Sequence, residues 1–146
     1  MQNIPPIEVN EICNQLREES PKSIKQVFGG DIHTSWQIEF NNSKFFIKRN
    51  ERKIKFLKFE ESCLKNLQKF INNDYLVVPK IISFLEINDV ELLLMEWIDM
   101  KNIDQQKLGK GLGEMHLESN RSNPKSFGYP INGYIGTTNQ VKGWEK

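Results

Sequence analysis

Three features of the sequence carry residue types suited to holding a phosphate: a glycine pair, a lysine in an apolar segment and a glutamate on a helical pattern. Gly29 and Gly30 lie at the turn between two predicted strands. Glycine there tolerates positive φ and lets backbone N–H groups approach an anion closely. Taken alone, such a pair is more often a plain hairpin turn. The glycines therefore count only together with the two charged residues.

The lysine is Lys48 and the glutamate is Glu60. Lys48 ends the run Phe-Phe-Ile-Lys, where strand alternation places its side chain on the same face as Phe46. Glu60 has Phe56 and Leu67 among its neighbours at helical spacing, which places it on an apolar stripe. Taken alone, Glu60 is more simply a solvated residue at the stripe's edge. Because unpaired charges are costly on buried faces, we expect Lys48 and Glu60 to form an ion pair.

A glycine loop, a strand lysine and a helix glutamate, in this order, are the parts with which kinases hold phosphate groups. The lysine neutralises phosphate oxygens, and the glutamate fixes the lysine rotamer. The apolar segment 92–95 then runs into a polar connector that can present backbone groups to an adenine edge. We expect Met95 at the pocket wall and main-chain hydrogen bonds from Glu96 and Ile98. An ordinary buried strand is the alternative for this segment.

The spacing of apolar residues predicts the elements that position these groups. Glycine, proline and asparagine separate them, and Asn88-Asp89 joins the last two strands. The order describes an α+β fold with a five-stranded antiparallel sheet carrying one long helix. The remaining segment 118–146 shows no clear element. The predicted helices cover 9–19, 53–71 and 108–117, and the predicted strands cover 24–28, 36–40, 44–48, 81–87 and 90–97.

The length and the net charge of the chain limit the classes of function that can be expected. The 146 residues, 38% of them hydrophobic, suffice for one domain or one lobe of a larger fold. Twenty basic and nineteen acidic residues give a net charge of +1, so no global field favours nucleic acid or an anionic membrane. No window approaches the roughly 20 apolar residues of a membrane span, and the N-terminus lacks a signal-peptide pattern. We expect a cytoplasmic protein with Cys13 and Cys63 as free thiols.

Several local motifs bear on the family of the chain: GGDIHTSWQI, FFIKRN, FEESCLKNL, VPKII, LLLMEWI and LGKGLGEMH, followed by FGY, NGYIGTTNQ and Trp144. These motifs are similar to those of the fructosamine (ketosamine) kinase family, relatives of the aminoglycoside phosphotransferases within the protein-kinase-like fold. The resemblance spans nearly the whole chain. It implies a kinase-like N-lobe and hinge over residues 1–100 and the start of a C-lobe over residues 101–146.

The resemblance also implies an activity and the residues that serve it. Members of the family use Mg-ATP to phosphorylate a sugar hydroxyl of a ketosamine, the product of amine glycation, which then breaks down to release the amine. By resemblance, Lys48 would contact the α- and β-phosphates of ATP, and Glu60 would hold Lys48 in place. The residues that would cover the phosphates are Gly29, Gly30, Asp31 and Ile32.

Family members continue into an HGDLW-type catalytic loop and a later aspartate that binds magnesium, and neither motif occurs before Lys146. We therefore expect this polypeptide to lack the general base, the Mg²⁺ ligands and most of the sugar-binding lobe, and to be inactive alone. Uncovered apolar surface around Leu112 and Met115 would favour self-association. Two other functions stay open: a non-catalytic nucleotide-binding or assembly module, and a lobe of an aminoglycoside- or choline-type phosphotransferase.

Three other patterns are explained more simply by structural roles than by functional sites. Gly109, Gly111 and Gly113 resemble a dinucleotide loop but lie within a helical pattern, so we interpret them as packing glycines. The two histidines, His33 and His116, are too far apart in sequence, and too far from cysteines, to predict a zinc site. The basic residues of segment 48–58 are interrupted by acids, which favours a solvated helix face over a nucleic-acid patch.

Overall fold

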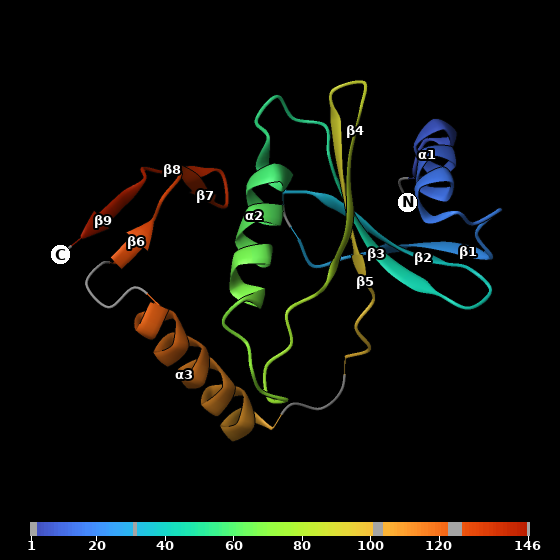
Figure 1. Cartoon of the computed structure of the whole chain (residues 1–146). Coiled ribbons are helices and arrows are strands. Elements are labelled where there is room, and N and C mark those ends of the chain that lie inside the picture. The colour runs from blue at the N-terminus through green and yellow to red at the C-terminus, as the bar shows by residue number, and fades with distance from the viewer. Residues whose placement is uncertain (1–2, 31, 101–103, 123–126, 146) are drawn as a thin grey trace. The chain divides into compact units, whose positions relative to one another are not determined.

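The computed structural model describes residues 3–30, 32–100, 104–122 and 127–145 (Figure 1). The chain divides into two compact units: the first comprises Met1–Glu61 and Pro79–Ile98, and the second comprises Ser62–Val78 and Asp99–Lys146. The elements are α1 (Pro6–Leu16), β1 (Ser23–Val27), β2 (Thr34–Glu39), β3 (Lys44–Asn50), α2 (Phe56–Gln68), β4 (Ile81–Ile87), β5 (Val90–Glu96), α3 (Gln105–Ser122), β6 (Phe127–Tyr129), β7 (Gly133–Ile135), β8 (Thr138–Gln140) and β9 (Gly143–Glu145).

The first unit is built on a five-stranded antiparallel sheet in the order β1-β2-β3-β5-β4. The predicted α+β class and the five predicted strands are confirmed. The turn between β4 and β5 consists of Asn88 and Asp89, with φ of 48° and 66°. Positive φ at both central residues matches the right-handed twist of a two-residue hairpin, which explains the choice of Asn and Asp.

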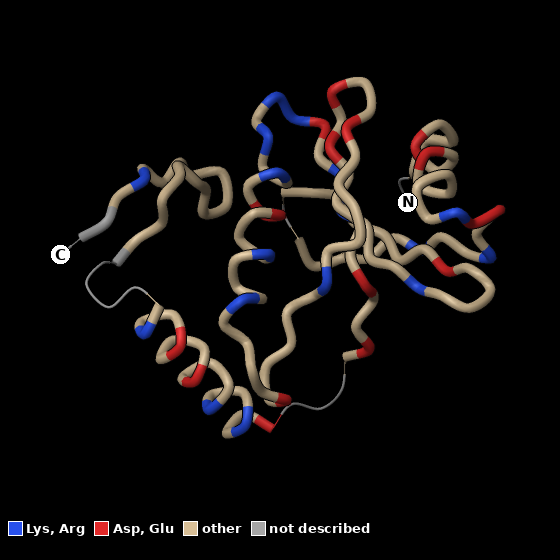
Figure 2. The backbone as a smooth tube through the Cα atoms, viewed as in Figure 1, with Lys and Arg blue, Asp and Glu red and all other residues tan. Residues whose placement is uncertain are grey.

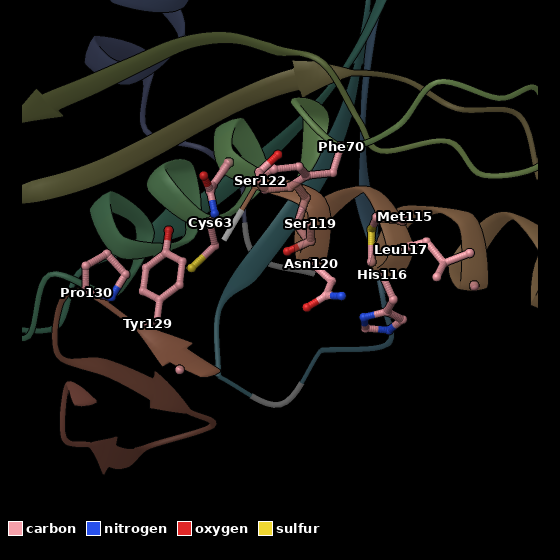
Figure 3. A pocket seen from close by; sticks show the side chains of 14 residues that line it. Cys63, Phe70, Met115, His116, Leu117, Ser119, Asn120, Ser122, Tyr129 and Pro130 are labelled. Atoms are coloured by element: carbon pink, nitrogen blue, oxygen red, sulfur yellow. The ribbon is translucent and has the colours of Figure 1, made fainter. Parts of the chain in front are cut away.

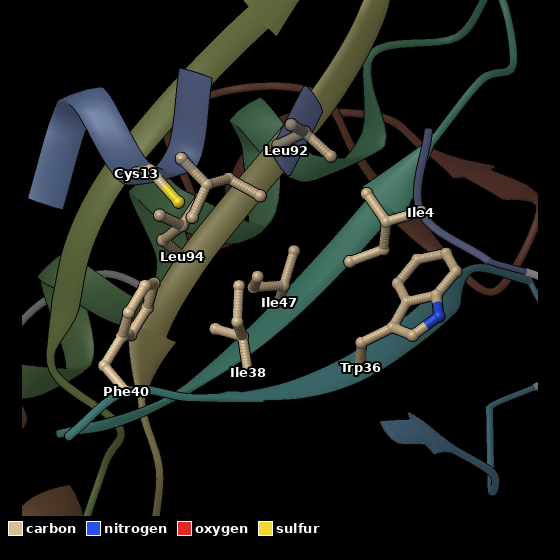
Figure 4. Close-up of a cluster of buried hydrophobic side chains, with 9 residues drawn as sticks. Ile4, Cys13, Trp36, Ile38, Phe40, Ile47, Leu92 and Leu94 are labelled. Carbon is tan, nitrogen blue, oxygen red and sulfur yellow. The ribbon is translucent and has the colours of Figure 1, made fainter. Parts of the chain in front are cut away.

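The main core of the first unit lies between α1 and one face of the sheet (Figure 4). The helix α1 begins at Pro6, earlier than the predicted 9–19, because proline is well suited to a first helical turn, where its missing N–H is not needed. It ends at Leu16, since Arg17 adopts the left-handed conformation with φ of 57°. The buried residues of this core are Ile4, Ile12, Cys13, Trp36, Ile38, Phe40, Ile47, Leu92 and Leu94.

A buried ion pair fixes α1 to the middle of the sheet. Arg49 Nε lies 2.8 Å from Glu8 Oε2, and Arg49 Nη2 donates to Glu8 Oε1 at 2.9 Å. The hydrogen bonds to Glu8 raise the pKa of the Arg49 guanidinium. The interpretation of Arg49 as part of a solvated helix face is wrong. The strand β3 continues to Asn50, so alternation turns Arg49 toward α1.

The second unit contains the C-terminal part of α2, the helix α3 and two small two-stranded sheets, β6-β9 and β7-β8. The sequence did not predict these sheets, because strands of three residues are too short for apolar alternation to be recognised. The helix α3 is longer than the predicted 108–117 at both ends. Met115 is buried and Leu112 is exposed, so the expected exposed apolar surface is confirmed at Leu112 and wrong at Met115.

One glycine of α3 permits a close approach within the second unit. A Cβ atom on Gly111 would lie 3.0 Å from the Cβ atoms of both Leu76 and Tyr75, whereas Cβ atoms on Gly109 and Gly113 would meet nothing within 4 Å. The prediction of packing glycines is therefore confirmed for Gly111 and wrong for the other two. A methyl group on Gly111 would therefore require these neighbours to shift by a few tenths of an ångström.

Cys13 and Cys63 are both free, as predicted. In the described ranges, no helix has the length and apolar character needed to cross a membrane.

The glycines of α3 give a matched pair of stability variants. Gly111→Ala should lower the free energy of unfolding by about 1–3 kcal/mol, because the added methyl group overpacks the contact with Leu76 and Tyr75. Gly109→Ala should raise it by about 0.5–1 kcal/mol, since an exposed helical alanine replaces a glycine. Urea denaturation followed by circular dichroism measures both, and equal effects of the two substitutions would contradict the packing role.

Candidate functional site

The predicted contact between Lys48 and Glu60 is present in the first unit. Lys48 Nζ donates to Glu60 Oε1 at 2.7 Å and to Oε2 at 2.9 Å. The two side chains retain 27% and 29% of their exposure, so the pair is desolvated only in part. An ammonium group held by both oxygens of one carboxylate has a defined position, yet solvent or a ligand can still reach it.

Alternation along β3 places Lys48 where this contact can form. Lys48 is opposite Ser35 of β2 and Leu93 of β5, and Leu93 is fully buried. Because Ile47 and Arg49 point to the α1 side, Lys48 points to the opposite face, where α2 lies (Figure 1). The lysine stem is thus held in an apolar layer with its amine directed at α2.

The glycine loop is the connection 28–33 between β1 and β2. Gly29 has φ of 131°, which strongly favours glycine, and a Cβ atom there would meet nothing within 4 Å. A Cβ atom on Gly30 would lie 3.9 Å from the His33 carbonyl oxygen, an ordinary contact. Ile32 is half-buried in this loop, and Asp31 lies outside the described residues. The need for glycine is therefore specific to Gly29.

His33 belongs to this site, although sequence reasoning considered it only as a metal ligand. Its ring packs edge-on against Phe56, the first residue of α2, with centroids 5.6 Å apart. The Nε2 atom is buried and has no hydrogen-bond partner among the described residues. Burial, followed by the charge of Lys48, lowers the pKa of the imidazole. His33 is thus a neutral group at neutral pH that packs the end of the glycine loop against α2.

A second buried carboxylate, also missed by sequence reasoning, lies at the N-terminus of α2. Glu91 is fully buried, and its Oε2 atom accepts hydrogen bonds from the Leu57 backbone N–H at 3.2 Å and from Asn50 Nδ2 at 2.7 Å. Its Oε1 atom accepts from the Lys58 N–H at 3.2 Å. The available signal was an acid inside the apolar run of β5.

The most buried acid within α2 itself is Glu61 and not Glu60. Glu61 is paired with Lys58, with Nζ and Oε2 2.8 Å apart, while Glu60 is half-buried. The expectation that Glu60 lies on the buried stripe is thus correct only in part. Its predicted partner is nevertheless the observed one.

Of the predicted hinge residues, Met95 and Glu96 are the last two residues of β5, and Ile98 follows the strand. Met95 is buried and lies opposite Phe46 of β3. The Glu96 N–H donates to the Lys80 carbonyl at 3.0 Å, and the Trp97 N–H donates to the Lys44 carbonyl at 3.3 Å. Both N–H groups therefore already donate within the sheet. On the backbone of Glu96, only the carbonyl group is left to form the predicted hydrogen bond with an adenine edge.

The basic residues of segment 48–58 do not form one surface. Lys48 and Arg49 lie on β3 and pair with acids on two different helices. Lys55 pairs with Glu86, and Figure 2 shows acidic positions interspersed among the basic ones along this part of the chain. The pairing of these charges is in keeping with the interpretation that they do not form a nucleic-acid patch, which stays a prediction.

The second unit contains a separate pocket of about 970 Å³ (Figure 3). Tyr129 borders it, with its hydroxyl 3.5 Å from Ser62 Oγ, and burial raises the pKa of that hydroxyl. None of the predicted site residues lines this pocket. Its labelled lining residues are Cys63, Phe70, Met115, His116, Leu117, Ser119, Asn120, Ser122, Tyr129 and Pro130.

Comparison with known protein families gives a match over residues 7–146 to the family model described as fructosamine kinase. A protein of Enterococcus faecium assigned as a ketoamine kinase is 29% identical over 121 residues, covering 82% of this chain and 40% of that protein. An uncharacterised Staphylococcus aureus protein of the ileS 3′ region is 31% identical over 119 residues, covering 77% of this chain and 88% of that protein.

Solved structures share the fold at low sequence identity. One from Haemophilus somnus 129PT, assigned as a fructosamine-3-kinase, matches with a TM-score of 0.75 and 18% identity, covering 94% of this chain and 46% of that one. An aminoglycoside phosphotransferase, APH(4)-Ia, in ternary complex with AMP-PNP and hygromycin B matches with a TM-score of 0.53 and 10% identity, covering 91% of this chain and 44% of that one. The fold is therefore protein-kinase-like, and the chain spans less than half of either structure.

The lowered pKa of His33 predicts a pH dependence of stability. In the unfolded chain His33 binds a proton near pH 6.5, whereas in the fold it does so only at lower pH. The unfolded state therefore binds more protons between these two values, and the free energy of unfolding falls as the pH decreases through that window. His33→Asn should remove this part of the slope in urea denaturation at pH 7.5 and 5.5, about 1 kcal/mol or less. Identical slopes in the two proteins would contradict the assignment.

Proposed function

The chain belongs to the fructosamine kinase family, and from this premise we propose that it forms the ATP-binding half of a cytoplasmic kinase that phosphorylates a sugar hydroxyl of glycated amines. The observation that carries the proposal is the ion pair in which Glu60 holds the amine of Lys48 with both carboxylate oxygens. A lysine fixed in this way can meet phosphate oxygens without first losing side-chain freedom.

Lys48 would contact the α- and β-phosphates of ATP. Its charge offsets the negative charge of the phosphate oxygens, and Glu60 keeps the amine directed toward them. The loop at Gly29 and Gly30, with Asp31 and Ile32, would cover the phosphates with backbone N–H groups. The positive φ of Gly29 and the open space around it support this role.

The adenine base would lie against Met95 and bind the Glu96 carbonyl and the main chain of Ile98. The observation that Glu96 donates its own N–H within the sheet supports a contact through the carbonyl alone. In this proposal residues 1–100 form the N-lobe and hinge, and residues 101–146 begin the C-lobe.

Mg²⁺ would accompany ATP and neutralise charge on the transferred phosphoryl group. The described ranges contain no group of three or more His, Cys, Asp or Glu side chains that could hold a metal ion. The Mg²⁺ ligands and the general base are proposed to belong to the remainder of a C-lobe, so these 146 residues alone would be inactive.

Removal of the proposed phosphate-binding amine should abolish turnover of the full-length gene product. Lys48→Met is expected to lower kcat/KM for Mg-ATP by on the order of 100-fold or more, since a preorganised charge is lost from the transition state. Lys44→Met is the matched control, because Lys44 lies on the same strand in an exposed pair with Glu39. The control should change kcat/KM by about twofold at most. Undiminished activity of Lys48→Met would count against the proposed site.

The substrate class is tested by comparing a fructosyl- or ribosyl-amine with an aminoglycoside and with choline as phosphate acceptors. We expect the kcat/KM for the ketosamine to exceed the others, as the family assignment implies. Preference for the aminoglycoside or choline would replace the proposed substrate. Mg-ATP binding without turnover of any acceptor would instead favour a non-catalytic nucleotide-binding module.

A further inference from the structure

The N-terminus of α2 depends on a group from another element. The residue before the helix is Lys55, which has no side-chain oxygen to accept a helix N–H, and the first turn contains no acidic residue. The first N–H groups of a helix have no partners within it and need acceptors elsewhere. At this position the acceptors come from Glu91 on β5, 34 residues from Leu57 and 33 from Lys58 along the chain.

Glu91 is itself held rigidly. It lies directly opposite Asn50 in the β3–β5 register, and Asn50 Nδ2 donates to it at 2.7 Å. The same Nδ2 group donates to the Ile54 carbonyl at 2.8 Å, and Asn50 Oδ1 accepts from the Arg52 N–H. The connection from β3 to α2 is thereby folded around the Asn50 side chain, and Glu91 marks where the helix begins.

The contacts of Glu91 with Asn50 and the N-terminus of α2, here called the anchor, lie close to the proposed phosphate-binding pair. Lys48 and Asn50 are two residues apart on β3 and share a face, so their Cα atoms are separated by roughly 7 Å. Glu60 follows Lys58 by two residues on α2, a rise of about 3 Å along the helix axis. A shift of the helix start by one residue would carry Glu60 about 1.5 Å along the axis and rotate it by about 100°. The bidentate contact with Lys48 requires a finer alignment than that.

We propose that Glu91 is a positioning residue that fixes the start of α2 and thereby aligns Glu60 with Lys48. The inference rests on the proposed function, because its purpose is to orient the amine that would meet ATP. Phe56 extends the same anchor to the glycine loop, since this first residue of α2 packs against His33. One buried carboxylate thus sets the helix end that both the lysine and the loop contact.

The proposal is tested on the 146-residue chain without nucleotide, so that its outcome is independent of the proposed activity. A zero-length carbodiimide joins amines to carboxylates in contact, and peptide mass spectrometry measures the Lys48–Glu60 and Lys44–Glu39 cross-links. The second pair is an internal reference, because it lies on β2 and β3 and does not involve α2. Glu91→Ala should lower the yield of the first cross-link relative to the second by about fivefold. This is the change in an equilibrium constant that corresponds to the roughly 1 kcal/mol of a lost helix cap.

Two further variants sharpen the result. Glu91→Gln keeps one acceptor oxygen and should lower the ratio less than Glu91→Ala does. Glu11→Ala is the control, since Glu11 is an exposed acid on α1 and not on α2, β3 or β5, and it should leave the ratio unchanged. An unchanged ratio in folded Glu91→Ala, or in Glu91→Gln if only that variant folds, overturns the proposal. Loss of the helical circular dichroism signal in both Glu91 variants also overturns it, because Glu91 would then stabilise the whole fold rather than position one helix.

Discussion

The ion pair between Lys48 and Glu60 is the constraint on which the site depends. A lysine on an inner face of a sheet needs an anionic partner, and a strand cannot supply one from its own neighbours when these are Phe46 and Leu93. The partner must come from a different element and must lie at the right position along that element to reach the amine. The sheet register and the starting residue of α2 must therefore both be correct before Glu60 can meet the amine.

The three residues of the segment Lys48–Asn50 each contact a different neighbouring element. Lys48 contacts Glu60 of α2, Arg49 contacts Glu8 of α1, and Asn50 contacts Glu91 of β5. Successive side chains of a strand point to opposite faces, so three consecutive polar residues can hold both helices against one strand. The end of β3 is consequently the point where the two faces of the sheet are tied together. Because β3 is the middle strand of the sheet, α1 and α2 are both positioned relative to it.

The sequence was sufficient for features whose signals are local, and insufficient for those set by distant residues. Alternation predicted the five strands, Asn88-Asp89 predicted a hairpin, and helical spacing suggested Glu60 as the partner of Lys48. Glu8 and Glu91 are each 41 residues from the β3 residue that they contact, and no local period marks such a pairing. The role of His33 depends equally on its packing against Phe56. The missed residues are those whose surroundings arise only when β3 comes together with β5 and with the helices α1 and α2.

Burial separates the carboxylate suited to function from those suited to structure. Glu91 is fully buried and Glu8 keeps only 5% of its side-chain exposure, and both have their oxygens occupied by donors from the fold. Glu60 keeps 29% and its partner Lys48 keeps 27%. A group that must release part of its hydration to a ligand has to remain accessible, whereas a group that only ties elements together gains from being enclosed. Of the three acids from α1, α2 and β5 that pair with the end of β3, Glu60 is therefore the one whose pairing leaves room for the phosphate proposed to meet Lys48.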